Sequence, residues 1–349
     1  MHDQASNLRS LVQSAGETGG AVGTMGGVRV LERSTEDSGS AARRESAAFV
    51  SLGPSAVKQQ KQSIRLAHAV AVCSGKGGVG KSNISINLAV ALSQFGLRVC
   101  VLDADLGMAN ADVLCNLTPN VTLEHVISGR ARLVDAMVAA PGGFRLIPGA
   151  SGVAGVADLG PMARHRLLEQ LSVLDRSADV LLIDIGAGIG ANVVDFAAAA
   201  HTTLVVTTPE PTAITDAYGM IKSLCESMPN AQIELAVNMA DSWEEGRDVY
   251  ERINRVCRTF LRREIALGGV IPRDTAVINA VKERVPFMLT EPDGLAARAI
   301  VAVGRGLIGL DRSAAFEVEG GFFSRLAGRM GSSREKRKFQ KWRSAARSD

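Results

Sequence analysis

Two lysines stand in one glycine-rich stretch, Cys73–Asn83, which reads CSGKGGVGKSN. Residues 75–82 match the pattern GxxxxGK[ST] and lie between an apolar run and a helix-like run, as a phosphate-binding loop requires. Glycines let backbone N–H groups turn towards phosphate oxygens, and the N-terminus of the following helix adds partial positive charge. Lys81 can reach the β- and γ-phosphates of a nucleotide, and Ser82 offers a hydroxyl to Mg²⁺. The stretch therefore predicts a nucleoside triphosphate site.

The other lysine, Lys76, stands five residues earlier, at the start of the loop, and cannot bind the same phosphates. A long cation at this position can point across the loop towards a second molecule docked on the nucleotide face. The alternative is an ordinary solvated surface charge. The loop thus predicts one lysine that binds the nucleotide and one whose purpose depends on a partner.

The segment KGGVGKS is similar to the deviant Walker A motif of the MinD/ParA ATPases. In that family two subunits enclose two ATP molecules, and a signature lysine approaches the nucleotide of the opposite subunit. The resemblance implies this role for Lys76, which would place positive charge on phosphoryl oxygens only in the dimer. It implies ATP and Mg²⁺ as cofactors, catalytic roles for Lys76 and Lys81, and nucleotide contacts from the whole loop. These contact residues are Gly75, Lys76, Gly77, Gly78, Val79, Gly80, Lys81, Ser82 and Asn83.

Aspartates end two of the later apolar runs, at the edge of a parallel sheet where ligands bind. Asp103 and Asp105 end the run VLDAD, and the resemblance extends to the family's switch I segment, DxDxGxxN. It implies that Asp105 orients the attacking water and approaches Mg²⁺, that Asp103 supports the magnesium shell from behind, and that Asn110 fixes the switch. The alternative for such residues is a helix cap.

A third aspartate, Asp184, ends the run LLID and resembles a Walker B carboxylate that holds Mg²⁺ through water. Gly186 and Gly188 follow it and would allow a mobile switch II. Because carboxylates and hydroxyls are ligands that Mg²⁺ prefers, the expected metal-binding residues are Ser82, Asp105 and Asp184.

Two later segments resemble the family's base-binding elements. Asn238 ends the run IELAVNM, and its amide suits the donor and acceptor edge of adenine. Pro272 and Asp274 belong to a loop after the run IALGGVIP that would pack on the base. The alternative for all three is that they are turn residues after strands.

Helices and strands must position these side chains, and the spacing of apolar residues predicts where these elements lie. Continuous apolar runs alternate with helical patterns, which predicts an α/β fold: a P-loop NTPase with a mostly parallel, doubly wound central sheet covered by helices on both faces. The helix after the loop spans residues 81–96 and ends at Gly96. The expected strands are residues 68–74, 98–105, 179–186, 202–209, 233–240 and 265–272.

Composition narrows the class of protein. A hydrophobic fraction of 46% with 21% charged residues is ordinary for a soluble globular chain, and no apolar run reaches the ~18 residues of a membrane-spanning helix. The N-terminus carries Asp3 and Arg9 without an apolar run, unlike a secretory signal. The five cysteines form no CxxC pair and are expected to be reduced core thiols. This argues against related redox or iron–sulfur ATPases, which need paired cysteines near switch II or the C-terminus.

The N-terminal region divides into an activator segment, residues 1–12, and a Gly- and Ser-rich flexible linker, residues 13–63, before an ATPase domain over residues 64–312. Residues 3–9, DQASNLR, are similar to the DQAxxLR motif of the FlhG (FleN) family, MinD-like ATPases that set the number of bacterial flagella. In that family the segment activates FlhF, a signal-recognition-type GTPase. The resemblance implies that residues 3–9 bind this partner. The alternative is a frayed terminus with accidental similarity.

Residues 313–349 form a basic amphipathic tail. Phe322, Leu326 and Met330 recur every four residues with arginines beside them, and from Arg325 onwards nine Lys/Arg stand against two acids, a net charge of 9 − 2 = +7. Such a stripe can lie in an anionic membrane interface, where the family has its membrane-targeting helix. A solvated tail and a DNA-binding tail are the alternatives.

Together these features predict a slow, Mg²⁺-dependent ATPase that is activated in its dimer and controls the number and placement of flagella. We expect a cytoplasmic protein with ATP-dependent peripheral association with the inner face of the cell membrane, with a position at the cell pole left open. Flagellar switch components or a transcriptional regulator are further partners known in the family. A ParA-like DNA-partitioning ATPase and a MinD-like division-site regulator are the alternative functions.

Overall fold

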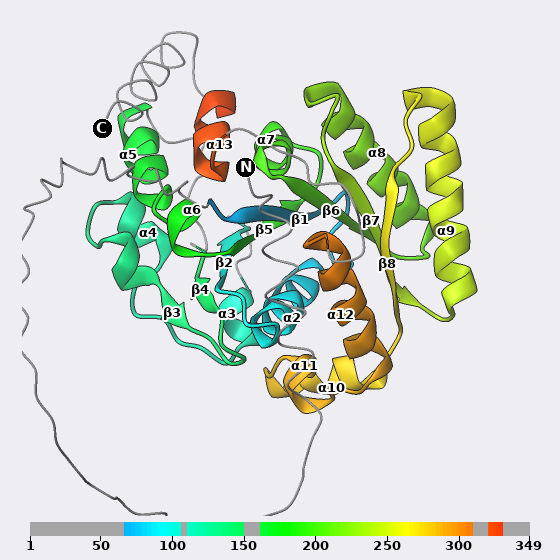
Figure 1. Cartoon of the computed structure of the whole chain (residues 1–349), viewed down its shortest axis with the longest axis horizontal. Helices are drawn as coiled ribbons and strands as arrows, with labels where there is room; N and C mark the ends of the chain where they lie inside the picture. Colours follow the sequence, from blue (N-terminus) through cyan, green and yellow to red (C-terminus); the bar gives the residue numbers. More distant parts are fainter. Residues whose placement is uncertain (1–65, 106–109, 150–160, 310–319, 331–349) are drawn as a thin grey trace, which may run out of the picture.

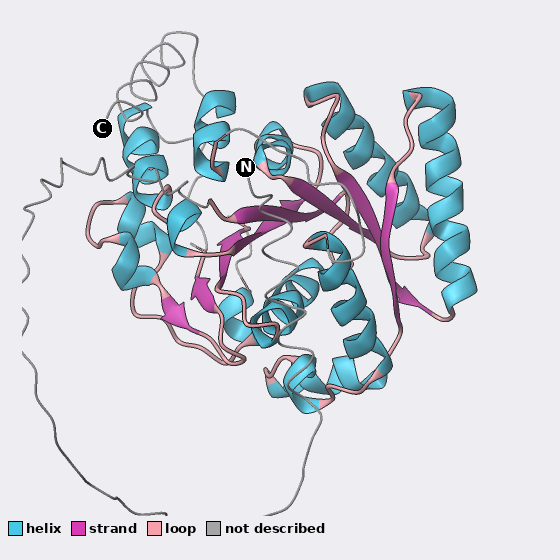
Figure 2. Ribbon diagram, viewed as in Figure 1, coloured by secondary structure: helices cyan, strands magenta, loops and turns pink. Residues whose placement is uncertain are grey.

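The computed structural model describes residues 66–105, 110–149, 161–309 and 320–330. The predicted activator segment 1–12, the linker 13–63 and residues 331–349 of the tail lie outside the described residues. Figure 2 shows a central sheet with helices on both sides, which confirms the predicted fold class.

The sheet has eight strands in the order β3-β4-β2-β5-β1-β6-β7-β8, and only β3 runs antiparallel to its neighbour. The six predicted strands are all present. Five are apolar runs with most residues buried, and the sixth, β8 at the sheet edge, is mostly half-buried. They are β1 (His68–Ser74), β2 (Val99–Ala104), β5 (Val180–Ala187), β6 (Thr202–Thr207), β7 (Ile233–Ala240) and β8 (Ala266–Pro272). Two short strands at one end of the sheet, the edge strand β3 (Val138–Ala139) and its neighbour β4 (Arg145–Ile147), carry too few residues for a hydrophobic pattern to show.

Alternate residues of each strand enter two separate cores. On β1, Val70 and Val72 pack beneath one group of helices, while Ala69, Ala71 and Cys73 pack beneath the other. The first group is α2 (Lys81–Gln94), α3 (Ala111–Leu114), α10 (Thr275–Glu283), α11 (Phe287–Thr290) and α12 (Leu295–Leu307). The second is α4 (Leu123–Ile127), η1 (Leu133–Ala136), α5 (Pro161–Leu171), α6 (Leu174–Ser177), α7 (Ala191–Ala199), α8 (Pro211–Ser227), α9 (Trp243–Val256), η2 (Cys257–Leu261) and α13 (Phe322–Met330). Figure 1 shows the two layers.

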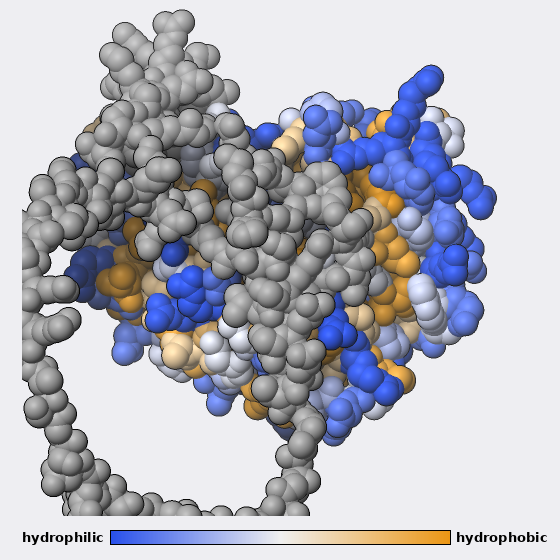
Figure 3. Space-filling model, viewed as in Figure 1, coloured by the Kyte–Doolittle hydropathy of each residue, from blue (hydrophilic) through white to orange (hydrophobic). Residues whose placement is uncertain are grey.

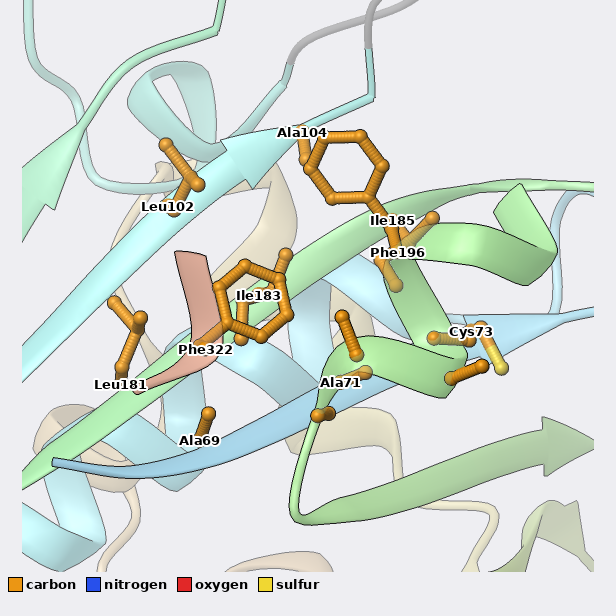
Figure 4. Close-up of a cluster of buried hydrophobic side chains, with 14 of the residues drawn as sticks. Ala69, Ala71, Cys73, Leu102, Ala104, Leu181, Ile183, Ile185, Phe196 and Phe322 are labelled. Atoms are coloured by element: carbon orange, nitrogen blue, oxygen red, sulfur yellow. The ribbon is translucent and has the colours of Figure 1, made fainter. Parts of the chain in front are cut away.

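The last helix, α13, is the predicted amphipathic helix of the tail, and its apolar side packs into the second core. Phe322 and Leu326 are fully buried, and Phe323 is 1% exposed. Figure 4 shows the ring of Phe322 beside Leu181 and Ile183 of β5. None of the described helices is long and apolar enough to cross a bilayer.

Candidate functional site

The glycine-rich loop joins β1 to α2 and leads directly into the helix N-terminus, as predicted. Gly80 precedes α2 with φ 91°, a left-handed conformation that favours glycine. A Cβ at Gly80 would overlap the side-chain amide of Asn238, and one at Gly75 would overlap the backbone of Asp216 in α8. The loop therefore fits against β7 and α8 only because these two positions lack side chains.

Lys81 and Ser82 are the first residues of α2, and they face the end of β5. The hydroxyl of Ser85, one turn further on, donates to Oδ1 of Asp184 at 3.3 Å. The other carboxylate oxygen, Oδ2, is buried without a hydrogen-bond partner among the described residues. Burial raises the pKa of Asp184 to about 6, and the hydroxyl of Ser82 and the charge of Lys81 act in the opposite direction.

A magnesium ion fits this set. Oδ2 of Asp184 is buried and has no hydrogen-bond donor among the described residues. The hydroxyl of Ser82 and the charge of Lys81 are close enough to affect the pKa of this carboxylate. Hard oxygen ligands of this kind suit Mg²⁺, and an added positive charge would compensate the cost of burying the carboxylate. Ser82 and Asp184 thus lie together at this edge of the sheet, and metal binding by these two residues stays a prediction.

Asp103 lies beside Asp184 in the register of β2 and β5. Its carboxylate accepts three backbone hydrogen bonds, each of 3.1 Å, from Asp105, Asn110 and Ala111. Burial, and then the charge of Asp184, raises the pKa of Asp103 to about 7. Asp103 therefore ties together the two ends of the switch I segment, of which residues 106–109 lie outside the described ranges.

The side chain of Asp105 lies over the segment that follows Asp184. A Cβ added to Gly186 would lie 3.3 Å from Oδ1 of Asp105, which is tight for any larger residue and leaves room for glycine. Asp105 is half-buried, directly follows β2, and its charge acts on the neighbouring Asp184. The role of Asp105 towards the attacking water stays a prediction.

Lys76 is held by its own chain. Its Nζ lies 2.8 Å from Oε2 of Glu210 and 2.9 Å from the hydroxyl of Thr212, at the N-terminus of α8. The hydrogen bond from Lys76 holds the pKa of Glu210 below its ordinary value. Lys76 is thus an ion-paired side chain here. Glu210 and Thr212 were missed from the sequence because they lie 134 and 136 residues away and no spacing marks them.

Asn238 connects the predicted base site with the loop. Its Nδ2 donates to the carbonyl of Val79 at 2.9 Å, and it is 8% exposed. One of the two N–H groups of this amide is therefore used within the chain, and contact of Asn238 with a nucleotide base stays a prediction. The next residue, Met239, has φ 57°, so the chain turns sharply after Asn238.

Pro272 ends β8 opposite Ala240 of β7, at the same sheet edge. Asp274 serves the fold, because its carboxylate accepts from Ala276 N at 2.9 Å and from Ala296 N at 3.3 Å. It thus caps α10 and joins the start of α12, and the turn-residue alternative describes these contacts. Nucleotide contact by Pro272 and Asp274 stays a prediction.

The cysteines are not paired, and Cys73 lies in β1 directly before the phosphate loop. All five are free thiols, and Cys225 alone is not fully buried. Burial raises the pKa of Cys73, Cys100 and Cys115 to about 12. The described ranges contain no group of three or more His, Cys, Asp or Glu side chains arranged to hold a metal ion.

Comparisons with known proteins agree with this geometry. The ParA family model, described as "NUBPL iron-transfer P-loop NTPase", matches residues 65–308. The antiactivator FleN of Pseudomonas aeruginosa is 42% identical over 247 residues, 71% of this chain and 88% of that protein. The flagellum site-determining protein YlxH of Helicobacter pylori is 36% identical over 263 residues, covering 74% and 88%.

Among solved structures, the MinC:MinD cell division complex of Aquifex aeolicus matches with a TM-score of 0.58 and 26% identity, covering 73% of this chain and 100% of that one. MinD of Pyrococcus furiosus matches with a TM-score of 0.56 and 25% identity, covering 69% and 98%. The phosphate loop, the aspartates at the sheet edge and the extent of these matches identify the chain as a member of the ParA/MinD family of P-loop ATPases.

Proposed function

We propose that this chain is an ATP-dependent switch that controls the number and placement of bacterial flagella. The observation that carries the proposal is its similarity, over most of their lengths, to FleN and to the flagellum site-determining protein YlxH. The switch would alternate between a monomer and an ATP-bound dimer on the inner face of the cell membrane, in the cytoplasm and at the cell pole.

The residues at the sheet edge would divide the work of phosphoryl transfer. Lys81 and the loop N–H groups would hold the β- and γ-phosphates, while Ser82 and Asp184 would hold Mg²⁺, which neutralises charge on the phosphates when bound. Asp105 would orient the water that attacks the γ-phosphorus, so that the bond to ADP breaks and inorganic phosphate leaves. Asp103 keeps Asp105 in place through the backbone.

The contact of Lys76 with Glu210 and Thr212 supports a monomer that hydrolyses ATP slowly. While Lys76 is held there, its charge is directed at its own α8 and is not available to a neighbouring subunit. Formation of the ATP dimer would exchange this contact for phosphoryl oxygens of the partner's nucleotide. Catalysis would then depend on assembly.

Asn238 supports adenine as the base. The bond from Nδ2 to Val79 fixes the orientation of the amide and leaves its oxygen as an acceptor and its second N–H as a donor, which match the N6 donor and the N1 acceptor of adenine. The carbonyl at the equivalent place on guanine would face another acceptor. ATP should therefore bind better than GTP.

The Asp105→Ala variant tests the enzymatic part of the proposal. It should form the ATP dimer and hydrolyse little ATP, whereas Lys81→Ala should neither bind ATP nor dimerise. Size-exclusion chromatography with light scattering and phosphate release measure both properties. Normal hydrolysis by Asp105→Ala would contradict the role of Asp105, and an ATP dimer of Lys81→Ala would contradict the assignment of the loop.

The partner GTPase FlhF would bind residues 3–9, at the end of the predicted linker. A chain without residues 1–12 should keep its ATPase activity and lose stimulation of FlhF, measured as GTP hydrolysis. Loss of ATPase activity would instead mean that the segment belongs to the fold. In this proposal residues 64–312 are the ATPase domain and residues 313–349 are the tail.

A second surface suits a protein partner such as a flagellar switch component or a transcriptional regulator. Phe260, in η2, is 72% exposed, the largest exposed fraction among the large apolar side chains described. Arg252, Arg255 and Arg262 are exposed nearby in the sequence and make no ion pair with another described residue. Figure 3 shows hydrophilic residues gathered along the rim formed by α9.

An exposed phenylalanine among arginines fits a partner segment that carries both apolar and acidic residues. Phe260→Ala should reduce capture of purified flagellar switch components while leaving ATP hydrolysis unchanged. Equal capture by the variant and the parent chain would place the partner elsewhere.

The membrane part rests on the tail, because α13 and the basic residues after it combine apolar and cationic groups. Sedimentation with anionic liposomes in ADP and ATP, with duplex DNA as competitor, tests it. ATP-dependent binding to liposomes supports the membrane switch. ATP-dependent binding to DNA alone would favour the ParA-like partitioning function.

A further inference from the structure

Four charged side chains follow four neighbouring strands at the nucleotide edge of the sheet. β1, β6, β7 and β8 are adjacent and parallel, so their carboxyl ends lie together. Lys76 comes after β1 and Glu210 after β6, while Asp241 directly follows β7 and Arg273 directly follows β8. Across the sheet the order is therefore cation, carboxylate, carboxylate, cation. We call these four residues the charge row.

The charge row forms two ion pairs. Nζ of Lys76 lies 2.8 Å from Oε2 of Glu210, and Nε of Arg273 lies 3.0 Å from Oδ1 of Asp241. The side chains of the first pair are 39% and 65% exposed, and those of the second are 61% and 74% exposed. Exposed pairs of this kind stabilise a fold little, because water competes for both charges. An exchange of partners within the charge row therefore costs little free energy.

Arg273 can bind a second carboxylate without leaving the first. Its backbone N–H donates to the carbonyl of Ala240 at 2.8 Å, which fixes the residue beside the end of β7. Nε is used by Asp241, and Nη2 reaches the carbonyl of Met239 only at 3.4 Å. Nη1 donates to no acceptor in the part of the chain that the structure describes. A guanidinium presents several N–H donors in a rigid fork, so it can bridge two carboxylates where an ammonium group cannot hold the same geometry.

Glu210 is within the electrostatic influence of both cations. The hydrogen bond and charge of Lys76 lower the pKa of Glu210, and the charge of Arg273 acts in the same direction. In the proposed function Lys76 leaves Glu210 for phosphoryl oxygens of the partner's nucleotide. The carboxylate would then have lost its closest cation, and Arg273 is the cation that remains beside it.

We propose that Arg273 is a positioning residue of the ATP dimer, which takes over Glu210 when Lys76 leaves and so bridges Glu210 and Asp241. This inference rests on the proposed function, in which Lys76 moves to the nucleotide of the opposite subunit. Arg273 acts through Lys76, because a carboxylate that gains a new partner releases the lysine at a smaller cost in free energy. It thereby favours assembly without contacting the phosphates.

The protein concentration at half-dimerisation tests this role. Light scattering of the full chain with Mg²⁺ and a non-hydrolysable ATP analogue compares Arg273→Gln with Arg247→Gln, an exposed arginine of α9 that forms no ion pair with another described residue. Arg273→Gln should raise this concentration about fivefold, because a symmetric dimer loses one exposed contact in each subunit. Arg273→Lys keeps the charge without the fork and should restore part of the loss. The same midpoint for Arg273→Gln and the parent chain, or an equal rise in the control, would overturn the proposal.

A double-mutant cycle separates partner exchange from a general effect of charge. Glu210→Gln removes the carboxylate that Arg273 takes over, so adding Arg273→Gln to it should change the midpoint by less than about twofold. A full effect of Arg273→Gln in the absence of Glu210 would overturn the exchange. The affinity for ADP, which requires no dimer, should be equal in Arg273→Gln and the parent chain. A loss of ADP affinity would place Arg273 in the base-binding loop and overturn its role in assembly.

Failure of this inference can be told apart from failure of the proposed function. If the parent chain dimerises with the analogue and Arg273→Gln does so equally well, the inference is wrong and the ATP switch stands. If the parent chain and every variant stay monomeric with the analogue, the dimer step of the proposed function is wrong, and the role of Arg273 is wrong with it.

Discussion

Truncation of Phe322 gives a quantitative test of how α13 packs. Its side chain is fully buried against Phe196, Phe323 and the face of β5. Replacing a buried phenylalanine by alanine costs about 3–5 kcal/mol, because apolar contact is lost and a cavity remains. For a domain of this size each kcal/mol lowers Tm by about 2–4 °C, so Phe322→Ala should lower Tm by about 6–20 °C.

The chain supplies its own control. Phe260→Ala removes the same atoms from a side chain that is 72% exposed, so its Tm should stay within about 1–2 °C of the parent. Differential scanning calorimetry of the full chain with ADP measures both. If Phe322→Ala leaves Tm where Phe260→Ala leaves it, α13 is not packed in solution and this reasoning is refuted.

Three further predictions concern the site and the core. Gly80→Ala should abolish ATP binding in calorimetric titration, because alanine is strained at this backbone conformation and its Cβ overlaps the side-chain amide of Asn238. An affinity for ATP equal to that of the parent chain would contradict this loop geometry. Glu210→Gln should form the ATP dimer at lower protein concentration, since Lys76 loses its charged partner. If light scattering shows the same protein concentration at half-dimerisation for the variant and the parent chain, this contact does not restrain assembly. His201→Gln should make the free energy of unfolding respond less to acid between pH 6.5 and 5. Burial lowers the pKa of His201 to about 2, while the unfolded chain takes up its proton near 6.5, so this histidine costs the parent chain about 1.4 kcal/mol for each pH unit below that value. The buried aspartates whose pKa is raised stabilise the folded state as the pH falls, and they do so equally in the parent chain and in the variant. Urea unfolding measured across this pH range should therefore differ between the two proteins, and the same pH dependence in both would contradict the prediction.

The parts of the site that the sequence predicted are local. Lys81 and Ser82 follow their glycines within one loop, and Asp184 ends an apolar run, so chain order alone brings them to one sheet edge. The sheet itself was predictable for the same reason: six strands are continuous apolar runs. β3 and β4 could not be predicted, because strands of two or three residues are too short to show a hydrophobic period.

The partners of Lys76 could not be predicted, because Glu210 reaches it only through the adjacency of β1 and β6 in the finished sheet. The apolar stripe on α13 was visible in the sequence, but apolar residues at every fourth position can pack into a protein groove or lie in a membrane surface equally well. Only the position of Phe196 and β5 shows that a groove exists.

The groove beneath α13 also affects how this protein can be prepared. A chain shortened to Glu319, or one carrying a bulky fusion directly before Phe322, would leave Phe196 and the adjoining face of β5 open to water. Bare apolar patches of this kind promote self-association during expression and storage. A shortened chain that precipitates would say nothing about its affinity for lipid.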